Sequence, residues 1–97
     1  MYAPTVADLG GVGEFEFKRP GDTIEGWVVD MIGWVVDYDP FAVKIKTDRG
    51  TYVVRVLPRM GLLRKHLYKR VRITYLGKDW DARYCELVSD FALTVLE

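Results

Sequence analysis

Two runs of β-branched and apolar residues, separated by Asp48-Arg49-Gly50, constrain the fold of this chain more than any other feature. They lie within residues 41–57, which read Phe-Ala-Val-Lys-Ile-Lys-Thr-Asp-Arg-Gly-Thr-Tyr-Val-Val-Arg-Val-Leu. A glycine at the third loop position favours a type I turn that is closed by a left-handed residue. The segment therefore predicts a β-hairpin.

The register of this hairpin determines which side chains face outward. If the residues on either side of Asp48-Arg49-Gly50 close the loop, Lys46 lies opposite Tyr52, and the outer face carries Tyr52 between Lys44 and Lys46. A ring held between two amines on an open sheet is what a stacked base and its phosphates need. The alternative is a solvated face on which Tyr52 covers its neighbours. A slip of one residue would exchange the two faces, and Arg55, which falls on the apolar side, leaves that slip open.

Length and composition indicate one small domain. The chain has 97 residues, 49% of them hydrophobic, which is enough for a core of its own. No apolar run reaches the roughly 20 residues that span a bilayer, and residues 1–5 lack the basic and apolar regions of a signal peptide. Cys85 is the single cysteine, so no disulfide within the chain is possible. We expect its side chain to be buried and the protein to be in a reducing compartment. We therefore expect a cytoplasmic protein that does not contact a membrane.

The formal net charge is zero, but the charges are segregated along the chain. Residues 1–40 carry eight acids and two bases, and residues 79–97 carry five acids and one base. Residues 41–78 carry eleven bases and one acid, a net charge of +10. This middle block permits one positive face, which is the electrostatic footprint of a polyanion binder. The alternative is that acidic and basic strands pair across the sheet and cancel locally.

Periodicity predicts the order of the elements. Residues 1–13 contain Pro4 and three glycines without a period, which indicates a flexible N-terminal arm before a domain over residues 14–97. The pentapeptide Gly-Trp-Val-Val-Asp occurs twice within residues 23–38, and its valines and tryptophans favour a long strand. Gly26 or Gly33 in that strand suggests a bulge or bend. Strands are expected at residues 14–18, 23–38, 41–47, 51–57, 71–76 and 84–88, and residues 91–96 continue as strand or short helix.

The segment after Pro58 has a helical spacing. Met60, Leu63 and Leu67 recur at i, i+3 and i+7, which predicts a helix of about two to three turns. Counted from the long strand at residues 23–38, this helix falls between the third and fourth strands, as it does in the five-stranded OB barrel. We therefore expect an all-β fold: a five-stranded OB-like barrel with one short helix between strands 3 and 4.

Two segments resemble a known family. Gly21-Asp22-Thr23-Ile24-Glu25-Gly26 opens the first long strand, and Val71-Arg72-Ile73-Thr74-Tyr75-Leu76-Gly77-Lys78 follows the expected helix. Together they resemble the small OB-fold single-stranded-DNA-binding proteins of phages and other viruses, which share a Gly-Asp-x-hydrophobic-x-Gly start and a late Val-x-Ile-x-Tyr-x-Gly-Lys strand. The resemblance covers residues 21–88 and implies a role in replication, in the host-cell cytoplasm for a viral protein. The chain departs from the pattern at Asp79-Trp80-Asp81, which adds two acids.

The motifs of common enzyme classes are absent from the sequence. It contains no Gly-x-x-x-x-Gly-Lys phosphate loop, paired-histidine motif or nucleophile elbow, so we expect no catalytic activity. His66 and Cys85 are too few ligands for a zinc cluster. Asp30, Asp37 and Asp39 have the chemistry to bind Mg²⁺, but acids at strand ends and turns are commonly solubilising. We expect no cofactor and no metal site.

The function that these features favour is non-enzymatic binding of single-stranded nucleic acid, with DNA preferred through the resemblance alone. In an OB barrel, the second and third strands and the loops after strands one and four face the ligand. Binding would combine base stacking with phosphate contacts and be largely independent of base sequence. The expected binding residues are Lys44, Lys46, Tyr52, Arg55, Trp34, Tyr38, Phe41, Lys78 and Trp80.

Two alternatives stay open beside this hypothesis. Trp27 and Tyr75 lie inside apolar strands and are expected in the core, whereas Trp34, Tyr38 and Trp80 adjoin acids, where exposure is expected and ligand contact is open. The alternative function is a protein–protein interaction or self-assembly module on a small β-barrel. Whether the chain forms a homo-oligomer is also open.

Overall fold

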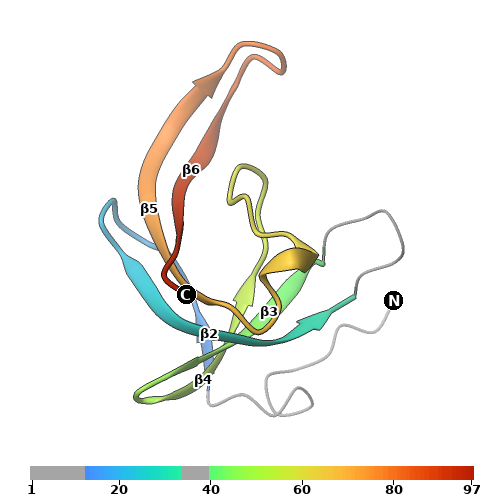
Figure 1. Cartoon of the computed structure of the whole chain (residues 1–97). Coiled ribbons are helices and arrows are strands. Elements are labelled where there is room, and N and C mark those ends of the chain that lie inside the picture. The colour runs from blue at the N-terminus through green and yellow to red at the C-terminus, as the bar shows by residue number, and fades with distance from the viewer. Residues whose placement is uncertain (1–12, 34–39) are drawn as a thin grey trace.

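Six strands and one short 3-10 helix form the fold in the computed structural model, which describes residues 13–33 and 40–97 (Figure 1). The all-β fold class is confirmed. Of the expected N-terminal arm, only Gly13 falls within the described residues, and it begins the first strand. The elements are β1 (Gly13–Phe15), β2 (Thr23–Ile32), β3 (Ala42–Thr47), β4 (Gly50–Arg55), η1 (Arg64–His66), β5 (Arg70–Asp81) and β6 (Glu86–Val95).

The six strands form one mixed sheet that curls into a half-barrel, in the order β1-β4-β3-β2-β5-β6 (Figure 1). β1 runs parallel to β4, and the other neighbouring pairs are antiparallel. β1 adds a sixth strand to the five expected in the barrel, at the outer edge of β4. The chain after β1 then packs against β6, where the Phe17 and Phe91 rings lie 5.2 Å apart, centroid to centroid.

β2 shapes the half-barrel because it pairs with two strands in succession. Residues 23–27 pair with β5, and Trp27 to Ile32 pair with β3. A Cβ atom at Gly26 would collide with the carbonyl oxygen of Lys46, so only glycine lets the strands cross this closely. The bulge expected at Gly26 or Gly33 lies instead between Val28 and Asp30.

The central hairpin forms, but its register differs from the expected one. Thr47 pairs with Gly50 rather than with Thr51, so Tyr52 lies opposite Ile45 instead of Lys46. The Thr47 hydroxyl donates to the carbonyl of Gly50 at 2.9 Å and accepts the Arg49 amide at 3.1 Å, which stabilises the tighter turn. As a result, Tyr52 is half-buried against the core and does not stand between two lysines.

The expected helix after Pro58 is wrong: the described residues contain no α-helix, and only η1 is helical there. Arg59 and Gly61 adopt φ of 67° and 76°, which an α-helix does not allow. Met60 and Leu62 are buried in the core, while Leu63 is exposed. His66 ends the segment, and its Nδ1 accepts the Leu63 amide at 2.9 Å. Burial lowers the pKa of His66, so the neutral form that accepts this bond is favoured.

β5 and β6 form a long hairpin that projects from the rest of the sheet (Figure 1). The residues expected as a turn, 77–81, continue β5, and the turn is formed by residues 82–85. We call the projecting part, residues 76–90, the hairpin arm. Cys85 is exposed in its turn, so the expectation of a buried cysteine is wrong. Tyr75, at the base of the arm, is buried in the core as expected.

Candidate functional site

A row of three side chains crosses the outer face of the sheet where β2 passes from one partner strand to the other. Trp27 on β2 pairs with Lys46 on β3 and with Arg70 on β5. Directly paired residues project from the same face of a sheet, so the indole has a lysine and an arginine as its cross-strand neighbours on that face. Trp27 is 41% exposed, which contradicts its expected place in the core. We call Lys46, Trp27 and Arg70 the Trp27 row.

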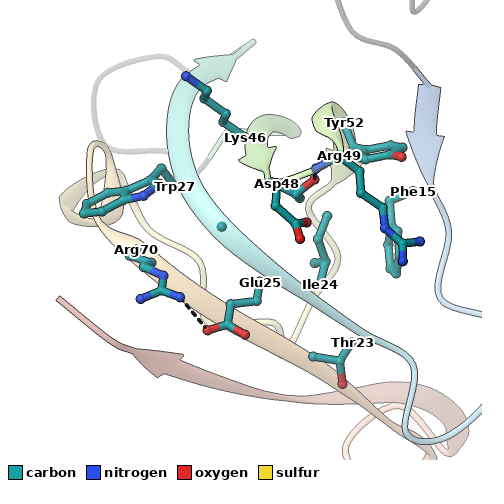
Figure 2. Close-up of a pocket in the computed structure, with 12 residues that line it drawn as sticks. Phe15, Thr23, Ile24, Glu25, Trp27, Lys46, Asp48, Arg49, Tyr52 and Arg70 are labelled. Carbon is teal, nitrogen blue, oxygen red and sulfur yellow. Dashed lines mark hydrogen bonds and ion pairs between the residues drawn. The ribbon is translucent and has the colours of Figure 1, made fainter.

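The three residues of the Trp27 row are among those that line an open cavity of about 820 Å³ (Figure 2). Figure 2 shows Trp27 and Arg70 on one side of the β2 ribbon, and Phe15, Arg49 and Tyr52 together beyond its other side. The turn between β3 and β4 brings Arg49 to the cavity. The cavity therefore combines three aromatic rings with three cations, which come from five strands and one turn.

Ion pairs engage part of the basic segment, residues 41–78, but some of its cations at this cavity have no carboxylate partner in the described part of the chain. Five of its eleven bases contact carboxylates within 4 Å: Lys44, Arg55, Arg59, Arg70 and Arg72. Local cancellation of charge therefore occurs across the sheet. Among the described residues, Lys46, Arg49, Lys65, Lys69 and Lys78 have no such partner. Lys46 and Arg49 both line the cavity, together with the acids Glu25 and Asp48.

Arg70 is held at the cavity by two carboxylates. Its guanidinium contacts Glu25 at 3.2 Å and Glu97 at 3.4 Å, and Figure 2 shows the contact with Glu25. Arg72 shares the same Glu25 oxygen at 3.6 Å. All four side chains are between 37% and 56% exposed, so each pair contributes little to stability.

Comparisons of this chain with protein-family models, curated proteins and solved structures give no match. The chemistry of the cavity is therefore what bears on its function. No group of three or more histidine, cysteine or carboxylate side chains among the described residues has the arrangement of a metal site. In the same part of the chain, no helix is long and apolar enough to cross a membrane.

Among the described residues, the structure brings together two of those expected to bind, Lys46 and Tyr52. Lys44 is paired with Asp30 at 3.8 Å and Arg55 with Glu14 at 3.6 Å. Phe41, Lys78 and Trp80 do not line the cavity. Phe41 is 48% exposed, Lys78 donates to the Ser89 hydroxyl on the hairpin arm, and Trp80 is 56% exposed on that arm. Trp34 and Tyr38 lie outside the described residues.

Two aromatic residues of the cavity, Phe15 and Trp27, were not expected at the site. The alternation of β2 could have indicated that Trp27 is exposed. Ile24 and Val28 face the core, whereas Trp27 lies on the opposite face of the strand with the charged Glu25. Arg49 and Arg70 were also missed. No pattern within the sequence marks Arg70, since its position depends on how β5 pairs with β2.

The two acids that interrupt the family-like pattern are engaged by arginines. Asp79 contacts Arg59 at 3.1 Å, and Asp81 contacts Arg59 at 3.3 Å and Arg83 at 3.2 Å. Hydrogen bonds from the Arg83 side chain are the main cause of a lowered pKa at Asp81. These contacts tie the hairpin arm to the loop that contains Arg59.

Proposed function

We propose that the protein binds single-stranded nucleic acid without catalysing a reaction, and that the Trp27 row is the centre of the binding surface. The observation that carries this proposal is the register that sets Trp27 between Lys46 and Arg70. An exposed ring flanked by two cations meets both needs of an unpaired nucleotide: a surface for the base and charge for the phosphates.

The magnitudes favour stacking as the main source of affinity. A base stacked on an aromatic ring contributes about 1–3 kcal/mol, and every base has a face that can stack. Contacts from Lys46 and Arg49 to phosphate add a term that depends on salt but not on base sequence. Tyr52 and Phe15 offer further aromatic surface within the same cavity. Binding is therefore largely independent of sequence.

The finer fold assignment, an OB-like barrel, belongs to the same proposal. β2, β3 and β4 follow one another as a meander, β5 returns to pair with β2, and β6 pairs with β5. These five strands correspond in order to an OB barrel, with η1 in the position of the short helix. β1 is an addition to that plan. In this scheme the hairpin arm, which carries Lys78 and Trp80, connects the last two strands of the barrel, and neither residue lines the cavity.

The segments at residues 21–26 and 71–78 extend the proposal to DNA as the preferred ligand. Their resemblance to phage and viral single-stranded-DNA-binding proteins also supports a role in replication within a reducing cytoplasm. A salt series against single- and double-stranded DNA and RNA of matched sequence separates these possibilities. Tighter binding to single-stranded DNA than to RNA or duplex supports the extended proposal.

Quenching of Trp27 fluorescence is the direct test of the proposed site. A Trp34→Phe and Trp80→Phe variant retains Trp27 as its single tryptophan, so any signal reports on the row. We expect an oligothymidylate to quench this emission at low salt and to dissociate as salt is added. Absence of quenching, or affinity that does not change with salt, contradicts the proposal.

One observation favours the alternative function, a module for protein interaction or self-assembly. The hairpin arm exposes Trp80 (56%), Tyr84 (68%) and Leu87 (62%), and Trp80 pairs with Leu87 across the two strands. Exposed aromatic and apolar side chains of this kind are common in protein interfaces. Light scattering tests it: a mass that changes with concentration and returns to the monomer value in Leu87→Ser supports association through the arm.

A further inference from the structure

Two arginines and two glutamates form one ion-pair network beside Trp27. The network has a defined geometry because the amide of Leu96 donates to the carbonyl oxygen of Arg70 at 2.8 Å, which keeps Glu97 next to Arg70. Glu25 contacts the same guanidinium through a different nitrogen, since Glu97 approaches Nη1 and Glu25 approaches Nη2. Carboxylates therefore engage both terminal nitrogens of Arg70.

We propose that Glu25 and Glu97 hold the places of ligand phosphates and are displaced when nucleic acid binds. This inference rests on the proposed function. Phosphate and carboxylate oxygens accept hydrogen bonds from the same guanidinium donors. The carboxylate side chains are 37% and 56% exposed, so they can turn into water without breaking the core. Arg70 thus changes partner rather than gaining one.

This exchange makes the two glutamates specificity-determining residues. A mononucleotide must displace a carboxylate with little other binding energy, so it gains little from Arg70. An oligonucleotide that is already held at Trp27 and Lys46 presents a further phosphate to Arg70 at high effective concentration. The network therefore favours extended single strands over free nucleotides and inorganic phosphate.

Neutral substitutions of the glutamates test the exchange by fluorescence anisotropy. The probe is a labelled oligothymidylate of about 12 nucleotides, within the range of site sizes for OB folds. We expect Glu97→Gln to tighten binding about threefold and Glu25→Gln with Glu97→Gln about tenfold at low salt, as for exposed ion pairs. The matched control is Glu86→Gln on the hairpin arm, which removes the same charge and should change affinity less than about 1.5-fold.

A double-mutant cycle shows whether the effect passes through Arg70. In an Arg70→Gln background, Glu97→Gln should no longer tighten binding, because its described partner is gone. If Glu86→Gln tightens binding as much as Glu97→Gln, the effect comes from the change in net charge of the protein, and the exchange is overturned.

The two proposals fail in different ways. If the wild type binds the probe, Trp27→Ala weakens it and the glutamine variants bind like wild type, the exchange is overturned and the proposed function stands. If only the double glutamine variant binds, the exchange is supported and the proposed function of the native chain is overturned. If neither the wild type nor the double glutamine variant binds the probe, the exchange and the proposed function are both overturned.

Discussion

Trp27 on the sheet and Trp80 on the hairpin arm are both exposed, at 41% and 56%, but their surroundings differ in charge. Trp27 has Lys46 and Arg70 as its cross-strand neighbours. Trp80 has Leu87 as its cross-strand neighbour and acids on both sides along β5, Asp79 and Asp81. Both places expose an aromatic ring, but the electrostatic settings differ.

Exposure of an aromatic ring is not sufficient for a nucleic-acid site. A base arrives with its phosphates, so the charge beside the ring decides whether stacking can be used. On the arm, the nearby arginines Arg59 and Arg83 already contact the acids of β5. At the Trp27 row, Lys46 has no carboxylate partner among the described residues. The same residue type therefore stands in two different electrostatic settings.

The largest expected effect comes from removing each ring in turn. Trp27→Ala should weaken oligothymidylate binding about thirtyfold, which corresponds to about 2 kcal/mol for one stacked base. Trp80→Ala should change affinity less than about twofold. Anisotropy with a labelled strand measures both, and the melting temperature of each variant checks that it folds. A greater loss for Trp80→Ala would move the site to the hairpin arm.

Much of the fold could be predicted because it follows from local alternation and turn chemistry. The hairpin at residues 41–57 and the start of β5 at Val71 are visible in the pattern of apolar residues. The register was wrong by one residue because the Thr47 side chain stabilises a tighter turn than the loop length alone suggests. That small difference turned Tyr52 toward the core and changed the identity of the central ring.

The remaining errors arise from contacts between segments distant in sequence. Met60 and Leu63 have helical spacing, but the half-barrel has room for Met60 and Leu62 in its interior and leaves Leu63 outside. The burial of Met60 and Leu62 depends on the sheet that surrounds them, which no short window contains. The place of Arg70 in the Trp27 row likewise exists only once β5 has paired with β2.

The second test compares two tyrosines and measures stability instead of binding. Tyr52 is half-buried against the core, so Tyr52→Ala should lower the free energy of unfolding by about 1–2 kcal/mol. Tyr84 on the arm is 68% exposed, and Tyr84→Ala should change it by less than about 0.5 kcal/mol. Urea denaturation measures both. Equal effects would mean that Tyr52 does not contribute to the core.

The third test compares a lysine near each tryptophan: Lys46 pairs with Trp27 across the sheet, and Lys78 precedes Trp80 by two residues on β5. Lys46→Gln should weaken binding about threefold at low salt and reduce the slope of log affinity against log salt by about one. Lys78 already donates to the Ser89 hydroxyl at 3.1 Å on the arm, and Lys78→Gln should leave the slope unchanged. Titrations at several salt concentrations distinguish them. A slope that falls only with Lys78→Gln would contradict the assignment of the Trp27 row.

The smallest expected effect concerns Asp81, whose contacts with Arg59 and Arg83 tie down the arm. The pKa of Asp81 is lowered in the folded state, chiefly by hydrogen bonds from Arg83. Its contribution is therefore present above the unfolded pKa, near 3.8, and is lost as the pH falls through the lower folded value. Asp81→Asn should lower the melting temperature slightly at neutral pH, and the difference from wild type should shrink in acid.

The matched control for Asp81 is Asp48→Asn, in the turn that lines the cavity. Asp48 has no ion pair among the described residues, so its substitution should leave the melting temperature unchanged across the same pH series. Neither substitution removes a contact of the Trp27 row, and both should retain oligonucleotide binding. If Asp81→Asn instead abolished binding, the arm and the row would form one functional surface, and the contrast between the two tryptophans would no longer hold.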